Sequence, residues 1–174
     1  DRITLSEKIN CPKLWDGVNS PALYRAEITL FCNGKPVDSI EQEFGIRSYR
    51  IDADNGFFLN GKPYPLHGVN YHQDSYESGW AMTDAQRERD YRIIRDMGCT
   101  AVRMAHYQHC DHEYSLCDRL GLCVWTEIGI INKMSADESD AHVISDGFGD
   151  NAKQQLRELI RQNYNHPSVI VWGL

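Results

Sequence analysis

The sequence lacks several features that would fix its class at once. No apolar run approaches the ~20 residues needed to span a bilayer, and residues 1–10, DRITLSEKIN, contain neither an apolar core nor a cleavage-site pattern. Basic residues are outnumbered, with 18 Lys and Arg against 25 Asp and Glu and a formal net charge of -7. Phosphate backbones bind clustered positive charge. We therefore expect neither a membrane nor a nucleic-acid partner, while the compartment stays open between cytoplasmic and exported settings.

The six cysteines lack the spacing of a disulfide or zinc framework. No CxxC pair is present. Cys32, Cys99 and Cys123 stand in apolar, strand-like contexts, where cysteine usually acts as a small buried hydrophobe. We therefore expect free thiols rather than disulfides.

The apolar residues of the sequence follow two different patterns, and the first pattern covers residues 1–53. Residues 22–32, ALYRAEITLFC, alternate polar and apolar side chains, and Asn33-Gly34 is typical of a hairpin turn. Residues 36–53 contain two further strand-like stretches. This pattern predicts the last strands of an antiparallel β-sandwich, with its earlier strands missing.

The second pattern begins near residue 57 and predicts strands that alternate with helices. A hairpin turns at Asn60-Gly61. A buried strand is then expected at 66–70, further apolar strands at 100–104, 122–126 and 168–172, and helices at 84–97, 111–120 and 150–164. In the first of these helices Tyr91, Ile94 and Met97 recur at helical spacing, while Asp84 can cap its start and Gly98 its end.

Short apolar strands that alternate with helices predict a parallel sheet. Four such units fit either a small doubly wound sheet or the first half of a (β/α)₈ barrel. A dinucleotide-binding doubly wound sheet carries GxGxxG after a strand, whereas Gly68 stands alone here. The half barrel is therefore favoured.

Polar side chains gather where the predicted strands end. They are Asn70 and His72 after the first strand, Arg103, His106 and Tyr107 on and after the second, and Glu127 at the end of the third. In a β/α barrel these ends meet at one rim, where the chemistry takes place. The alternative is a buried salt-bridge network of His72, Arg103 and Glu127 with no further role.

Aromatic residues near this rim indicate a sugar ligand. They are Tyr71, Trp80, Tyr107, Trp125 and Trp172. Flat aromatic faces suit the apolar C–H faces of pyranose rings, and the polar rim residues suit the hydroxyls. For the two tryptophans within strands, Trp125 and Trp172, packing inside the barrel or under its helices is at least as good an interpretation.

The stretch His106–His112, HYQHCDH, contains ligand types that zinc prefers. No second ligand pair stands at zinc-finger spacing. We expect His109 to His112 to open a surface helix, with Asp111 as its N-cap. A metal or redox protein built on this stretch and the cysteines stays an alternative.

Three segments together resemble glycoside hydrolase family two. Residues 44–47, FGIR, with 57–74, FFLNGKPYPLHGVNYHQD, resemble the family's passage from a sandwich domain into the first barrel strand. Residues 99–127, CTAVRMAHYQHCDHEYSLCDRLGLCVWTE, resemble its Arg, His-Tyr and Cys-Asp signature with a strand ending in Glu. Residues 165–174, NHPSVIVWGL, resemble the run that leads into the family's Asn-Glu.

The resemblance implies an immunoglobulin-like sandwich, whose last part is residues 1–53, and a catalytic (β/α)₈ barrel, whose first half is residues 54–174. The implied reaction is retaining hydrolysis of terminal β-linked sugars by two Glu residues ~5 Å apart. A β-galactosidase is the first expectation and a β-glucuronidase the next. Both catalytic Glu are expected beyond Leu174, so this chain alone is predicted to be an inactive fragment.

The resemblance also implies supporting roles at the rim. His72 and His106 match histidines that line the sugar subsite, with Tyr107 beside them and Asn70 orienting His72. Such histidines can bond hydroxyls and stabilise charge as the glycosidic bond breaks.

Two charged residues complete the implied set. Arg103 would orient a catalytic carboxylate and keep it ionised, and Glu127 would fix these partners from behind. Two departures from the family, Gln108 in place of Pro and Thr100 in place of Asn, affect a loop and a strand start. Residues 128–133 lack the second acid of the magnesium site found in some relatives, so we predict no metal and no cofactor.

A non-catalytic carbohydrate-binding module that reuses a half barrel is the alternative function. Half a barrel also leaves strand edges and an apolar interior uncovered. The isolated chain is therefore expected to be poorly soluble or to associate with itself, and a homo-oligomer is possible.

Overall fold

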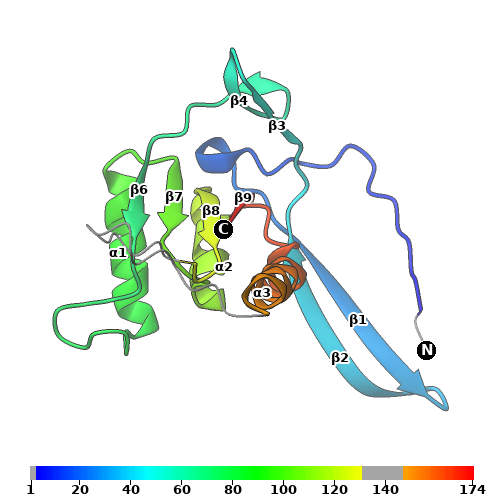
Figure 1. Ribbon diagram of the computed structural model, residues 1–174. Helices are drawn as coiled ribbons and strands as arrows, with labels where there is room; N and C mark the ends of the chain where they lie inside the picture. Colours follow the sequence, from blue (N-terminus) through cyan, green and yellow to red (C-terminus); the bar gives the residue numbers. More distant parts are fainter. Residues whose placement is uncertain (1–2, 131–146) are drawn as a thin grey trace, which may run out of the picture.

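In the computed structural model, which describes residues 3–130 and 147–174, the strands form three separate sheets (Figure 1). A two-stranded hairpin comes first, a three-stranded antiparallel sheet follows, and a four-stranded parallel sheet with its helices completes the described part. None of the described helices is both long and apolar enough to cross a membrane.

The hairpin consists of β1 (Tyr24–Cys32) and β2 (Lys35–Phe44), as the alternating pattern predicts. Its turn residues Asn33 and Gly34 have φ of 51° and 75°, which a tight turn of this type requires. The hairpin projects away from the parallel sheet (Figure 1). Cys32 is exposed, so its predicted burial is wrong, because no layer covers this strand within the described residues. Large apolar side chains are exposed on both strands: Ile28, Leu30, Phe31, Val37 and Ile40.

The next strand, β3 (Tyr49–Asp52), forms where the sequence predicts a strand, but it does not pair with the β1–β2 hairpin. It is antiparallel to β4 (Gly56–Leu59), which in turn pairs with β5 (Lys62–Pro63) across the predicted Asn60-Gly61 turn. The prediction that this strand extends the sandwich is therefore wrong in its pairing. A chain reversal after only a few residues brings β3 and β4 together before any distant strand can compete.

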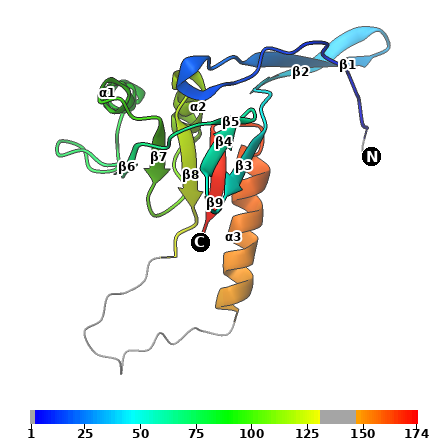
Figure 2. The ribbon, with the colours of Figure 1, turned by 90° about the horizontal axis from the view of Figure 1, so that it is seen from above.

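The parallel sheet has the order β6-β7-β8-β9. These strands are Gly68–Tyr71, Ala101–Met104, Cys123–Glu127 and Val169–Gly173, and the helices that follow the first three are α1 (Asp84–Asp96), α2 (Asp111–Leu120) and α3 (Phe148–Asn163). Figure 2 shows α3 running beside β9. A doubly wound sheet reverses its strand order at a switch point, whereas consecutive order is that of a β/α barrel. The predicted half barrel is confirmed.

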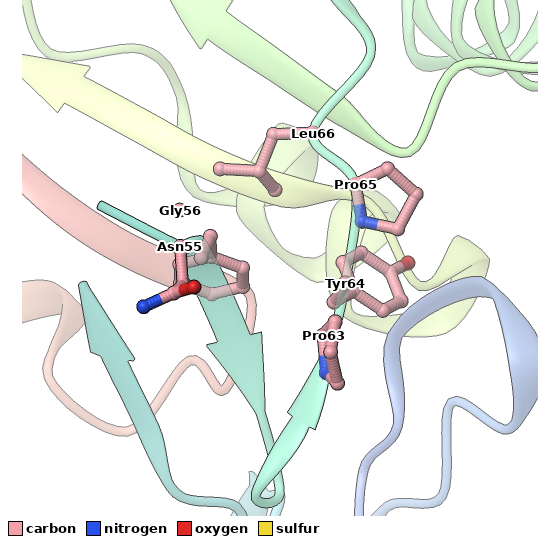
Figure 3. Close-up of a pocket in the computed structure, with 7 residues that line it drawn as sticks. Asn55, Gly56, Pro63, Tyr64, Pro65 and Leu66 are labelled. Carbon is pink, nitrogen blue, oxygen red and sulfur yellow. The ribbon is translucent and has the colours of Figure 1, made fainter. Parts of the chain in front are cut away.

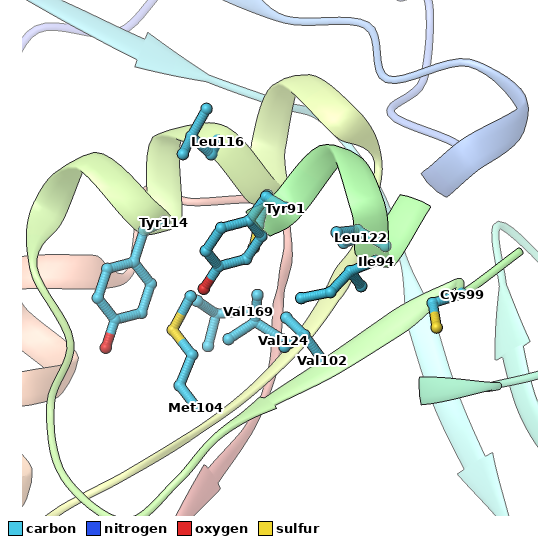
Figure 4. Packing of buried hydrophobic residues seen from close by; sticks show 11 residues of the cluster. Tyr91, Ile94, Cys99, Val102, Met104, Tyr114, Leu116, Leu122, Val124 and Val169 are labelled. Carbon is cyan, nitrogen blue, oxygen red and sulfur yellow. The ribbon is translucent and has the colours of Figure 1, made fainter. Parts of the chain in front are cut away.

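The main core lies between the sheet and the first two helices (Figure 4). Each large apolar side chain that is fully buried contributes about 1.5–3 kcal/mol. The buried residues of the main core are Tyr91, Ile94, Cys99, Val102, Met104, Tyr114, Leu116, Cys117, Leu122, Val124 and Val169.

A second core joins the antiparallel sheet to the beginnings of β8 and β9. Leu59 and Tyr64 pack there with Cys123 and Ile170, around a Trp15 that is fully buried. Figure 3 shows the pocket beside this core. The pocket has a volume of about 440 Å³ and is lined by Asn55, Gly56, Phe57, Pro63, Tyr64, Pro65 and Leu66.

The predicted N-caps Asp84 and Asp111 are each displaced by one residue, and the third helix begins at Phe148 rather than at residue 150. Thr83 caps α1, and its backbone and side chain exchange hydrogen bonds with Gln86, so that Asp84 occupies the first turn. Cys110 holds the N-cap position of α2 without a side-chain bond, and Asp111 again follows it. An N-cap residue must have an extended backbone, and in both helices the acidic residue is already helical.

The predicted burial of Met97 and of the first parallel strand, β6, is wrong, whereas the predicted C-terminal end of α1 is correct. Met97 is 66% exposed, since it lies past the last turn of α1 that packs on the sheet, whereas Tyr91 and Ile94 are buried as predicted. β6 is only half-buried because it is an edge strand within the described sheet. Gly98 has a positive φ of 85° and ends α1 as predicted.

Candidate functional site

Glu127, at the end of β8, is the buried centre of a polar cluster at the rim. Its side chain is 4% exposed. Arg103 Nε donates to Glu127 Oε1 at 2.6 Å, and His106 Nδ1 lies 3.2 Å from Oε2. Because a carboxylate only accepts, the second contact requires a proton on Nδ1, which in the neutral ring leaves Nε2 as an acceptor. Both oxygens of Glu127 are thus occupied.

The partners of Glu127 remain accessible from the rim. The side chains of Arg103 and His106 are 34% and 38% exposed, and Arg103 Nη2 lies 3.3 Å from His106 Nδ1. The cluster therefore leaves a guanidinium and an imidazole partly exposed at the rim, both in contact with one buried carboxylate.

Trp125 lies on the inner face of the sheet rather than in its core. Its side chain is 45% exposed, and the Arg103 guanidinium lies 5.2 Å from its ring centre. A Cβ at Gly173 would collide with the indole nitrogen of Trp125 and with the Glu127 side chain, so only glycine fits there. Trp172 instead packs against the main core, as the packing interpretation predicts.

A hollow of about 390 Å³ lies along this inner face. Asn70, Arg103 and Trp125 line it together with apolar residues from all four parallel strands. Asn70 is the register partner of Arg103, so the two side chains lie next to each other. No hydrogen bond joins Asn70 to His72 in the described residues, and the predicted orienting role of Asn70 stays a prediction.

His72 and Tyr107 extend the cluster along the rim. The His72 ring centre lies 5.4 Å from that of His106 and 6.1 Å from that of Tyr107. The loops that carry them are tied by Gln73, whose N–H donates to the Tyr107 hydroxyl at 3.3 Å and whose Oε1 accepts from the Cys110 N–H at 2.8 Å. The structure thus brings together the predicted histidines, Tyr107, Arg103 and Glu127.

A second polar cluster lies beneath the rim and was not predicted. His109 is fully buried rather than on a surface helix, and its Nδ1 lies 2.6 Å from Glu113 Oε2. Arg87 Nε and the Tyr91 hydroxyl both donate to Glu113 at 3.2 Å. The four-residue spacing of His109 and Glu113 is the available signal, because it is the spacing of neighbours on a helix, although His109 itself lies just before α2.

The histidines of the possible metal loop do not converge. His106 contacts Glu127, His109 contacts Glu113, and His112 lies 3.7 Å from Glu88. Residues 3–130 and 147–174 contain no group of three or more His, Cys, Asp or Glu placed to hold a metal. The prediction about magnesium rests partly on residues 131–133, which lie outside the described residues.

All six cysteines are free thiols, as predicted. Cys99 and Cys123 are buried. Burial raises the pKa of Cys123 to about 12, despite the opposing charge of Arg47. This thiol is accordingly protonated and packs as an apolar group.

The NHPS segment before β9 is held by Asp118 of α2. Asp118 accepts from the Ser168 N–H at 3.1 Å, and its other oxygen lies 2.5 Å from His166 Nδ1. Burial lowers the pKa of His166, but the bond to Asp118 and the charges of Asp118 and Asp111 outweigh burial, and the net pKa is raised. His166 therefore supports the strand, and its contact with Asp118 favours the cationic form of the ring.

Arg47 of the FGIR motif fixes the same segment from the other side. Its Nε donates to the Pro167 carbonyl at 2.7 Å and its Nη2 to the Val169 carbonyl at 2.5 Å. Burial lowers the pKa of Arg47 below its usual value, although the group stays charged. Two of the motifs thus meet in space and set the position of β9.

Comparison with known proteins agrees with this arrangement. Residues 51–174 match the model of the TIM barrel domain of glycosyl hydrolases family 2, and residues 2–47 match the model of glycosyl hydrolases family 2. A β-glucuronidase of Bacteroides fragilis is 46% identical over 95% of this chain, and a β-galactosidase of Thermoanaerobacterium thermosulfurigenes is 34% identical over 97%. The crystal structure of a Bacteroides uniformis β-glucuronidase is 41% identical and has a TM-score of 0.81 over 93% of this chain.

This chain spans only part of each of these proteins. It covers 24% and 22% of the two relatives and 18% of the solved chain. The matches nonetheless run through the sandwich hairpin and all four barrel strands. The chain belongs to glycosyl hydrolases family 2, and residues 51–174 are part of the TIM barrel domain of that family.

Proposed function

We propose that the protein carrying this chain hydrolyses terminal β-linked glycosides with retention, and that this chain forms one wall of its sugar site. The observation that carries the proposal is the Glu127 carboxylate, held by Arg103 and His106 at the carboxyl edge of adjacent parallel strands. In a β/α barrel this edge is where substrate binds.

Glu127 is assigned a supporting role. A retaining nucleophile needs a free oxygen aimed at the anomeric carbon, and both oxygens of Glu127 already have partners. No second carboxylate pairs with this cluster in residues 3–130 and 147–174. We therefore assign both catalytic carboxylates to residues other than those that the structure describes.

The remaining rim groups are assigned to the sugar itself. His106 Nε2 and the His72 ring can bond hydroxyls, and the half-exposed Trp125 offers a flat face to the C–H face of a pyranose. Arg103 supplies positive charge that holds a neighbouring carboxylate ionised. No metal ion is required for these roles.

A β-glucuronide is the preferred substrate class and a β-galactoside the second. The sequence alone ranks them in the opposite order. The relatives named β-glucuronidases are 46% and 37% identical to this chain, whereas a relative named β-galactosidase is 34% identical. The higher overall identity to the β-glucuronidases supports this order.

The test is hydrolysis of 4-nitrophenyl β-glucuronide, β-galactoside and β-mannoside by the full-length protein, with the first-formed anomer followed by NMR. We expect release of the β-anomer first, fastest from the glucuronide. Release of the α-anomer first, or no hydrolysis of any β-glycoside, would contradict the proposal.

The isolated chain is the matched control, and it should release no nitrophenol. Sugar binding by calorimetry, combined with a full-length protein that hydrolyses nothing, would instead favour a carbohydrate-binding module.

A further inference from the structure

Three aromatic rings form a column at the outer end of the rim. The Tyr107 ring stacks on Trp80 on one side, with centres 5.0 Å apart and planes 29° apart. It also stacks on the His109 imidazole, at 5.1 Å and again 29°. Tyr107 is thus in contact with both rings, and its hydroxyl accepts from the Gln73 N–H.

The base of this column is buried and rigid. The His109 side chain is fully buried, and its ring nitrogens lie 2.6 Å from Glu113 Oε2 and 3.2 Å from the Ala105 carbonyl. Arg87 and Tyr91 fix Glu113 in turn. A buried ionisable pair with all its partners satisfied resists displacement, because any shift leaves a charge uncompensated.

The top of the column is open. Trp80 is 69% exposed although one of its faces is covered by Tyr107. The other indole face is therefore available to a ligand. Such a face suits flat rings, which gain from stacking with centres roughly 4.5–7 Å apart, and the C–H face of a pyranose.

The column continues the row of sugar-site residues. His106 touches Glu127, His72 lies 5.4 Å from His106, and Tyr107 lies 6.1 Å from His72. Trp80 comes next along this row, one ring beyond Tyr107. A substrate whose first sugar lies at the Glu127 cluster would bring its next ring toward Trp80.

We propose that Trp80, supported by Tyr107 and His109, is the stacking subsite for the ring of the leaving group, and so determines preference for ring-bearing over small leaving groups. This inference rests on the proposed β-glycosidase function. It assigns a specificity role to a residue outside the Glu127 cluster.

The test compares two substrates of the same sugar in the full-length protein, a 4-nitrophenyl β-glycoside and a β-glycosyl fluoride. Trp80→Ala should lower kcat/KM for the nitrophenyl glycoside about three- to ten-fold, the loss expected for one aromatic stack, and leave the fluoride within two-fold. Trp80→Phe should restore most of the loss, because it retains a flat ring.

Tyr76 provides the matched control, since it is fully exposed on the same loop and has no ring partner among the described residues. Tyr76→Ala should leave both substrates unchanged. Equal losses on both substrates with Trp80→Ala, or no loss on the nitrophenyl glycoside, would overturn the inference. Failure of the proposed function is distinguishable, because the unaltered protein would then hydrolyse neither substrate.

Discussion

Glu113 illustrates, at the scale of a single residue, how much this rim depends on groups below it. Its fully buried carboxylate accepts from Arg87 and Tyr91 and faces His109. Removing one member of a buried ion pair leaves the others uncompensated, which typically costs about 3–5 kcal/mol. We therefore expect Glu113→Ala to lower the free energy of unfolding by that amount, measured by urea denaturation with tryptophan fluorescence.

Glu88 is the appropriate control for this measurement. Its side chain is 38% exposed and pairs with Arg92 on the helix surface, where ion pairs contribute about 0–1 kcal/mol. Glu88→Ala should therefore change stability little. A similar small effect of Glu113→Ala would mean that the buried cluster does not support the fold.

His166 predicts a pH dependence of stability. Its folded pKa is raised, because the bond to Asp118 and the charges of Asp118 and Asp111 outweigh burial. The stabilisation is thus fully present below the unfolded pKa of about 6.5 and is lost as pH rises through the folded pKa. His166→Gln should lower the unfolding midpoint more at about pH 6 than at about pH 9.

The control for this pH dependence is His67, an exposed histidine that forms no ion pair in the described part of the chain. His67→Gln should shift the midpoint equally at both pH values. An effect of His166→Gln that is larger at the higher pH would contradict the assignment of a cationic ring.

Several residues of the candidate site could be predicted from the sequence and others could not. Arg103, His106 and Glu127 stand at strand ends, and the ends of parallel strands share one edge, so local pattern was sufficient. The burial of His109 depends on Glu113 and on Arg87 of a different helix. Polar residues of that kind look solvent-exposed in a sequence until their partners are known.

At the scale of elements, α1 begins at a different N-cap from the one that the sequence suggested. The N-cap is Thr83 rather than Asp84. Thr83 and Gln86 form a capping box, whereas Asp84 lies in the first turn and is 69% exposed. Thr83→Ala should cost about 1 kcal/mol, the usual value for loss of an N-cap side chain. Asp84→Ala should cost less, because it removes a largely exposed charge near the helix N-terminus and one 3.5 Å contact with Arg87.

The same urea denaturation compares these two variants directly. A larger cost for Asp84→Ala than for Thr83→Ala would favour the cap that the sequence suggested. A one-residue uncertainty is expected here, since Thr, Asp and Gln all suit helix starts, and only backbone geometry selects among them.

The elements themselves were predictable because their signals are local. Positive φ is needed at the hairpin turns Asn33-Gly34 and Asn60-Gly61 and at the helix stop Gly98. Asparagine and glycine tolerate positive φ, so these residue types indicate the turns and the helix end. The pairing of β3 with β4 was not predicted. Strands compete for pairing partners, and the sequence pattern of residues 36–53 does not indicate which of the two antiparallel sheets a strand joins.

At the scale of the whole molecule, the described residues leave two apolar surfaces without a covering layer. One is the β1–β2 hairpin, where Ile28, Leu30 and Ile40 border a groove together with Leu5. The other is the inner face of the parallel sheet, which is open along Asn70 and Trp125. Exposed apolar surface of this extent favours association.

We therefore expect the isolated chain to associate in a concentration-dependent manner in sedimentation velocity. Ile28→Thr together with Leu30→Thr should reduce this association, because these substitutions remove apolar area from the hairpin and place β-branched strand formers at both positions. The exposed Ile93 on α1 is a control, since Ile93→Thr removes apolar area of one exposed side chain away from both surfaces. A monomer at all concentrations would show that the two open surfaces are compatible with an independent unit, and the half barrel would then have to be stable without the strands that close it in its relatives.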